Sequence, residues 1–227
     1  MSTRTHRPIP LGLTMLVALF SALVALAVSG GHDASAHDDA AHARTAVSPA
    51  ELALRQDMRK LWEDHVTWTR LAVISLTTAS PDTKTTVARL LRNQSDLGNA
   101  IVPFYGRAAG TKLTTLLREH ILIAADLVGA AKEGDRKAVA AEQARWQANA
   151  DEIAAFLSSA NPRSWKPAEM RAMMRAHLAL TTSEVVARVT RNWSAGVRAY
   201  DLIHVQILEM ADMLSDGLVA QFPGRFR

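Results

Sequence analysis

The sequence has no cysteine in its 227 residues. This absence excludes disulfides, thiolate metal sites, lipid attachment through cysteine and covalently attached c-type haem. Phosphate-cradling glycine loops and the nucleophile-elbow pattern are also missing, so nothing in the sequence indicates nucleotide use or hydrolase chemistry. No segment of strand length alternates between apolar and polar residues, so we expect no β-sheet.

A strong excess of one charge is missing as well. The net charge is +4, and it falls to +3 without residues 1–36, which contain two arginines and one aspartate. The remaining charges are interspersed along the predicted helices instead of forming a basic stripe. We therefore expect no nucleic-acid partner and interpret the charges as solvated helix faces.

Residues 1–36 have the layout of a signal peptide. The first ten residues carry two arginines and no acidic group, residues 11–28 are free of charge, and Ala34-Ser35-Ala36 supplies a small-x-small cleavage pattern. We expect an extracytoplasmic protein, secreted, periplasmic or held in the cell envelope. Because residues 11–28 lie at the lower limit for spanning a bilayer, an uncleaved N-terminal anchor is the alternative and would be the protein's contact with a membrane.

Residues 37–47 and 48–223 differ sharply in character. The first segment is rich in His, Asp and Ala without an apolar period, which predicts a disordered tether. The second predicts one helical domain, because proline is tolerated at helix starts and in loops but not in helix interiors.

Capping patterns set the expected helix boundaries. Ser48-Pro49 with Glu51 opens a helix, Gly134-Asp135 separates two helices, and Thr181 to Glu184 resembles a capping box that opens the last one. The expected helices cover 49–78, 81–93, 107–132, 136–161, 167–178 and 181–221, with 93–106 as a loop. The predicted fold is all-α, with four long helices and two short ones in an antiparallel helical bundle.

Polar residues near the middle of the long helices are the candidate site. His65, His120 and His204 each lie on an apolar stripe near a helix midpoint, and neighbouring helices in a bundle bring their midpoints to a similar level. Asn149 occupies the middle of the remaining long helix, and Asp201 precedes His204 by three residues, which places their side chains together. The sequence therefore predicts a mid-bundle layer of these five residues, facing the core.

Two interpretations of this layer follow, since buried polar groups must be satisfied internally. The main hypothesis is a mononuclear transition-metal site for zinc, copper or iron, with His65, His120, His204, Asp201 and Asn149 as ligands. The alternative is an envelope structural or interaction module whose core histidines are hydrogen-bonded and bind no metal. A third hypothesis is an enzyme that uses one of the histidines as a general base.

Two weaker metal candidates remain beside the layer. Met170, Met173, Met174 and His177 share one face of a predicted short helix, and thioethers with an imidazole could hold Cu(I), although methionine is also a common core filler. His37 would become the N-terminal residue after cleavage, and its amine and ring could then bind copper.

Four segments carry a resemblance to known sequences. They are LWEDHVTWTR (61–70), LLREHILIAADL (116–127), RWQANADEIAAFLSSANP (145–162) and ADMLSDGLVAQFP (211–223). With these segments the chain resembles a family of bacterial helical proteins with exported-type leaders, over most of residues 50–223. The resemblance implies a shared helical fold and no particular activity.

The export hypothesis predicts the N-terminus of the mature protein. Cleavage after Ala36 should make His37 the first residue. N-terminal sequencing of protein isolated from the native envelope or secreted fraction checks this, and recovery of Met1 would instead support the uncleaved anchor.

Overall fold

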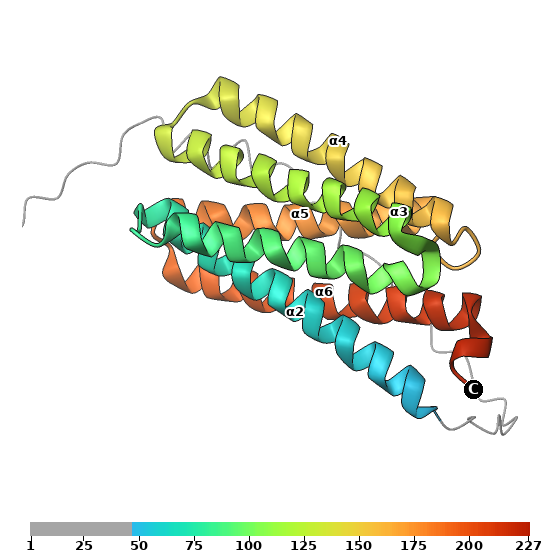
Figure 1. Ribbon diagram of the computed structural model, residues 1–227. Coiled ribbons are helices and arrows are strands. Elements are labelled where there is room, and N and C mark those ends of the chain that lie inside the picture. Colours follow the sequence, from blue (N-terminus) through green and yellow to red (C-terminus); the bar gives the residue numbers. More distant parts are fainter. Residues whose placement is uncertain (1–46) are drawn as a thin grey trace, which may run out of the picture.

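The computed structural model describes residues 47–227, and within them every regular element is helical. The predicted signal peptide and all of the predicted tether except Val47 lie outside the described residues. The elements are α2 (Pro49–Thr78), α3 (Thr83–Glu133), α4 (Arg136–Ala160), α5 (Pro167–Val189), α6 (Trp193–Gln221) and the 3-10 turn η1 (Pro223–Arg225) (Figure 1). None of the described helices is both long and apolar enough to cross a membrane.

Two of the predicted helix boundaries are confirmed. The Ser48 hydroxyl accepts a hydrogen bond from the Glu51 backbone N–H at 3.1 Å and so caps α2. Gly134 ends α3 with a left-handed φ of 75°, a conformation that favours glycine. Asp135 then caps α4 by accepting from the N–H groups of Lys137 and Ala138.

The loop predicted over 93–106 is wrong, because the chain stays helical up to a kink at Gly106. At this residue φ is 82° and ψ is 169°, so α3 consists of two straight parts that meet there. Leu97 and Ile101 are buried in the main core, and this burial favours helix despite the nearby Gly98 and Pro103.

The capping box predicted at 181–184 is also wrong. Thr181 and Glu184 lie inside α5 and are buried, and the Glu184 carboxylate accepts from Arg70 of α2 at 2.6 Å instead of from its own backbone. The last helix begins twelve residues later, where the Asn192 side chain accepts from the Ala195 N–H at 3.1 Å. Residues 47–227 therefore form five helices of at least 23 residues, in place of the four long and two short ones expected.

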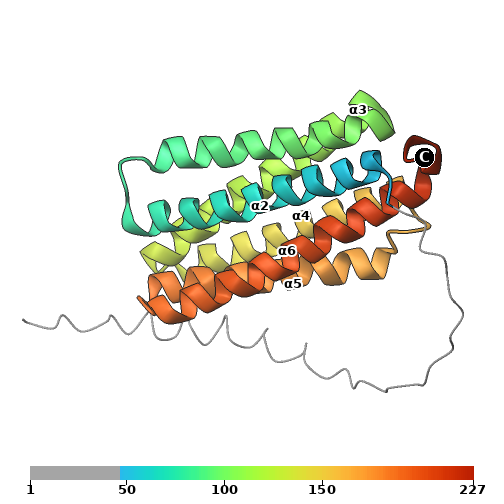
Figure 2. The ribbon, with the colours of Figure 1, turned by 90° about the horizontal axis from the view of Figure 1, so that it is seen from below.

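The kink in α3 divides the domain into three helical hairpins. The first is α2 with residues 83–105, the second is residues 107–133 with α4, and the third is α5 with α6; Figures 1 and 2 show the two arms of each hairpin side by side. In addition α2 packs on α6, and α4 packs on α5. These contacts close the three hairpins around a shared apolar core.

Gly98 and Gly110 let the two parts of α3 approach closely. A Cβ on Gly98 would lie 2.6 Å from the Gly110 carbonyl oxygen, and a Cβ on Gly110 would lie 2.8 Å from the Gly98 oxygen. Both distances are well below van der Waals contact, so the first and second hairpins can only pack this way with glycine at these positions.

Gly98→Ala should therefore destabilise the fold, by about 1–3 kcal/mol for the overpacking. Gly129→Ala is the matched control in the same helix, since nothing lies within 4 Å of the position that its methyl group would take, and it should stabilise by up to about 1 kcal/mol through helix propensity. Urea unfolding measures both, and equal effects of the two changes would contradict the close packing.

Candidate functional site

Three of the five predicted site residues are buried in the middle of the domain. His65 is 3% exposed, and His120 and Asn149 are each 4% exposed. Their helices are α2, α3 and α4, as the apolar stripes indicate. The prediction that these three residues face the core is confirmed.

The placement of His204 and Asp201 in the same layer is wrong. The His204 side chain is 42% exposed, its Nε2 lies 3.2 Å from the Glu63 carboxylate, and Asp201 is exposed. The apolar stripe that contains His204 lies at the edge of the contact between α6 and α2. Trp193 and Val197, on this stripe near the start of α6, are each at least half exposed.

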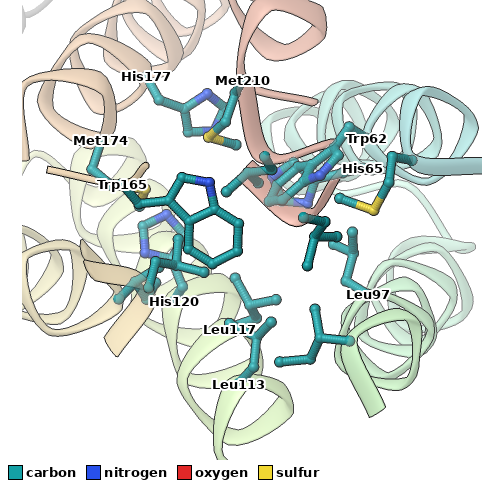
Figure 3. A pocket seen from close by; sticks show the side chains of 16 residues that line it. Trp62, His65, Leu97, Leu113, Leu117, His120, Trp165, Met174, His177 and Met210 are labelled. Atoms are coloured by element: carbon teal, nitrogen blue, oxygen red, sulfur yellow. The ribbon is translucent and has the colours of Figure 1, made fainter. Parts of the chain in front are cut away.

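His177 of α5 takes the third place in the layer. It is 4% exposed, and its ring centroid lies 5.7 Å from that of His65. The sequence pattern places His177 at the end of a short helix, because Thr181 resembles a new helix start. In the continuous α5 the residue is near mid-helix, and Figure 3 shows the rings of His65, His120 and His177 coming from three different helices toward one cavity.

Each buried histidine contacts a carboxamide 29 residues further along the chain. The Nδ1 atom of His65 lies 3.3 Å from Gln94 Nε2. The Nδ1 atom of His120 lies 2.7 Å from Asn149 Oδ1, and that of His177 lies 3.0 Å from Gln206 Oε1. In every hairpin the histidine is on the first arm and the carboxamide on the second, so these contacts join the two arms.

Backbone hydrogen bonds fix which tautomer two of the histidines adopt. Asn149 Nδ2 donates to the Leu116 carbonyl and Gln206 Nε2 donates to the Met173 carbonyl, in each case four residues before the histidine. The amide oxygens must then face the rings, so Nδ1 of both His120 and His177 carries the proton. Their Nε2 atoms are therefore lone-pair acceptors.

In the first hairpin two residues share the contacts that Asn149 and Gln206 each make alone in the other hairpins. Asn93 donates to the Leu61 carbonyl, four residues before His65, while Gln94 Nε2 donates to Leu90 O and contacts His65 Nδ1. Gln94 Nε2 has two hydrogens and also donates to Asn93 Oδ1 at 3.1 Å, so its contact with Nδ1 does not by itself fix the tautomer of His65. The layer thus holds two Nε2 acceptors, those of His120 and His177.

Cavities lie on both sides of the histidine layer. One of about 40 Å³ is bordered by the residues three positions before each histidine, which are Trp62, Leu117 and Met174 (Figure 3). The other, of about 50 Å³, is bordered by the residues eight positions after each histidine, which are Val73, Val128 and Val185. These three valines form a core cluster of their own. The three hairpins therefore contribute equivalent residues to successive layers.

Burial keeps the three rings uncharged. It lowers the pKa of His120 to about 3 and the pKa of His65 well below its usual value, and in both cases charge on His177 would lower it further. Burial also lowers the pKa of His177. A general base works best with a pKa near the working pH, so these values argue against the hypothesis of acid–base catalysis.

The metal candidates do not come together among residues 47–227. No group of three or more His, Asp or Glu side chains in this part of the chain is arranged to hold a metal ion. Met170 and Met174 belong to the main core and Met173 packs against it. His37 lies outside the described residues.

The neutral histidines predict a steep pH dependence of stability. Below pH 6.5 the unfolded chain takes up protons on these rings while the folded protein does not, so the free energy of unfolding falls by about 1.4 kcal/mol per pH unit for each of them. For His120 this loss continues until the pH approaches its folded pKa of about 3.

Urea unfolding of the protein at several pH values between 7.5 and 5 measures this slope. Each of the variants His120→Gln and His177→Gln should lower the slope of the unfolding free energy against pH by the contribution of one proton, about 1.4 kcal/mol per pH unit. The comparison variant is His204→Gln, which removes a histidine that lies outside the buried layer. Identical slopes in all four proteins would show that the buried rings are not held neutral.

The site is thus a neutral, hydrogen-bonded histidine layer between two small cavities. No family model, curated protein or solved structure matches the chain.

Proposed function

We propose that the protein is a structural or interaction module of the cell envelope whose histidine layer holds the fold together without a metal. The observation that carries the proposal is the contact of each histidine Nδ1 with a carboxamide 29 residues later. Three contacts at the same sequence spacing, one in each hairpin, suit a device that braces helices. A metal site would instead need ligand atoms that converge on a single point.

The extracytoplasmic location belongs to the proposal and rests on the leader alone. An interaction role is supported by the surface of α6. Among the described residues eight large apolar side chains are exposed, and four of them lie on this helix. They are Trp193, Val197, Leu202 and Val205.

A transition-metal site is the second candidate. Metal-binding histidines usually donate their other ring N–H to an oxygen, and His120 and His177 do so toward Asn149 and Gln206. This arrangement leaves two Nε2 lone pairs available to zinc, copper or iron. Asn149 would then support a ligand instead of being one.

A double-mutant cycle between His120 and Asn149 tests the bracing role. Asn149→Ala leaves the buried His120 Nδ1–H without its acceptor and should cost about 1–3 kcal/mol of unfolding free energy. His120→Leu and Asn149→Ala together should cost less than the sum of the single changes by about 0.5–3 kcal/mol. Asn161→Ala is the control, since this equally buried asparagine donates to Gly217 O and makes no contact with His120.

Melting of the untagged protein with zinc, copper or iron separates the two candidates. A bound metal would stabilise the fold by about 2.7 kcal/mol when its free concentration is a hundred times the dissociation constant. The bracing role predicts no rise in melting temperature. A rise that is lost in His120→Leu and kept in His204→Leu would establish the metal site instead.

A further inference from the structure

Unpaired buried polar atoms gather around the larger cavity, which we call the valine-side cavity. It is bordered by the histidine layer and the cluster of Val73, Val128 and Val185 and has a volume of about 50 Å³. Three residues that line it each have a buried polar atom without a hydrogen-bond partner. These atoms are His120 Nε2, Thr181 Oγ1 and Trp146 Nε1. A buried polar group left unpaired costs about 1–3 kcal/mol, so such a concentration points to a ligand.

The chemical role of His120 Nε2 follows from its tautomer. Because Nδ1 donates its proton to Asn149, Nε2 has a lone pair and no hydrogen. His120 is 4% exposed, and burial keeps it neutral. The atom can therefore only accept a hydrogen bond, and its partner must bring a proton of its own.

Thr181 differs from Thr69 and Ser183, two other hydroxyl residues near the site. Thr69 of α2 donates to the His65 carbonyl at 2.7 Å, and Ser183 of α5 donates to the Ala179 carbonyl at 2.9 Å. This bond to the carbonyl four residues earlier is the usual partner of a hydroxyl inside a helix. Thr181 is 4% exposed and makes no such bond, so its hydroxyl can serve the cavity.

We propose that the valine-side cavity binds a small neutral molecule that carries one hydroxyl group. The hydroxyl donates to His120 Nε2 and accepts from the Thr181 hydroxyl, while its apolar body lies against the valine cluster. Both roles can be filled by one hydroxyl group, which has one donor and two acceptor lone pairs. This inference concerns a ligand of the histidine layer and adds to the bracing role proposed above.

The lining and the volume restrict the charge and the size of the ligand. No Asp, Glu, Lys or Arg lines the cavity, so an ion would be buried without a counter-charge. One water molecule needs about 10–15 Å³ of cavity volume, and an engineered apolar cavity of about 150 Å³ holds benzene. A cavity of about 50 Å³ therefore fits a molecule of roughly three or four non-hydrogen atoms.

The test compares 2-propanol with acetone, which share a carbon skeleton but differ in the hydrogen-bond donor. Each is titrated into the untagged protein, and methyl NMR signals of Val128, Val185 and Thr181 are followed. We expect saturable shifts with 2-propanol, NOEs from its methyl groups to the valines, and binding of acetone that is weaker by about tenfold, because acetone cannot donate to His120 Nε2.

Two isosteric variants locate the hydroxyl. Thr181→Val should weaken the binding of both 2-propanol and acetone about five- to tenfold, because both oxygens accept from this hydroxyl, and should leave the advantage of 2-propanol over acetone largely intact. Thr69→Val is the matched control, since Thr69 lines the same cavity but its hydroxyl is already bonded to a backbone carbonyl. It should leave the affinity unchanged, and thermal melting verifies that both variants fold.

Two results would overturn the proposal. Equal binding of 2-propanol and acetone would mean that the cavity accepts any small apolar molecule. The absence of saturable shifts would mean that the polar atoms serve bound water only. Neither result bears on the His120–Asn149 coupling, so failure of this inference is distinguishable from failure of the bracing role.

Discussion

The structure depends on the hydrogen bond between a buried imidazole Nδ1 and a carboxamide on the adjacent helix. An imidazole in an apolar core must be neutral and must have a partner, or it costs more than the core can offset. At His120 the Asn149 oxygen meets Nδ1 at 2.7 Å, and its amide also binds the Leu116 backbone. One side chain thereby satisfies the ring Nδ1 and a carbonyl, fixes the tautomer and sets the register of two helices.

This constraint is repeated in each hairpin, which explains the layered core. His65, His120 and His177 follow one another at intervals of 55 and 57 residues, and each partner comes 29 residues later. Once the histidines meet at one level, the residues eight positions further on also meet, which produces the valine cluster. The close approach at Gly98 and Gly110 lets the first and second hairpins join within one bent helix.

Periodicity and capping predicted much of this fold but not its hairpin repeat. The all-helical class and the starts of α2 and α4 follow from local signals, and the stripes placed His65, His120 and Asn149 correctly. The regions 93–106 and 181–184 were mispredicted because glycine, proline and threonine are loop or cap signals that burial overrode. His204 was misplaced because a helical wheel cannot distinguish the centre of a buried face from its edge. One sequence signal could have identified His177 as a member of the layer. It is the repeated spacing in which a histidine is followed 29 residues later by Asn or Gln.

The central claim is that the three histidines are neutral and that His120 and His177 are locked in defined tautomers. Long-range ¹H–¹⁵N correlation of the imidazole rings at pH 7 measures this directly, because protonated and lone-pair nitrogens give separate signals. The account predicts one lone-pair nitrogen signal from each ring, which for His120 and His177 belongs to Nε2. Charged rings, averaged tautomers or the opposite assignment would contradict it.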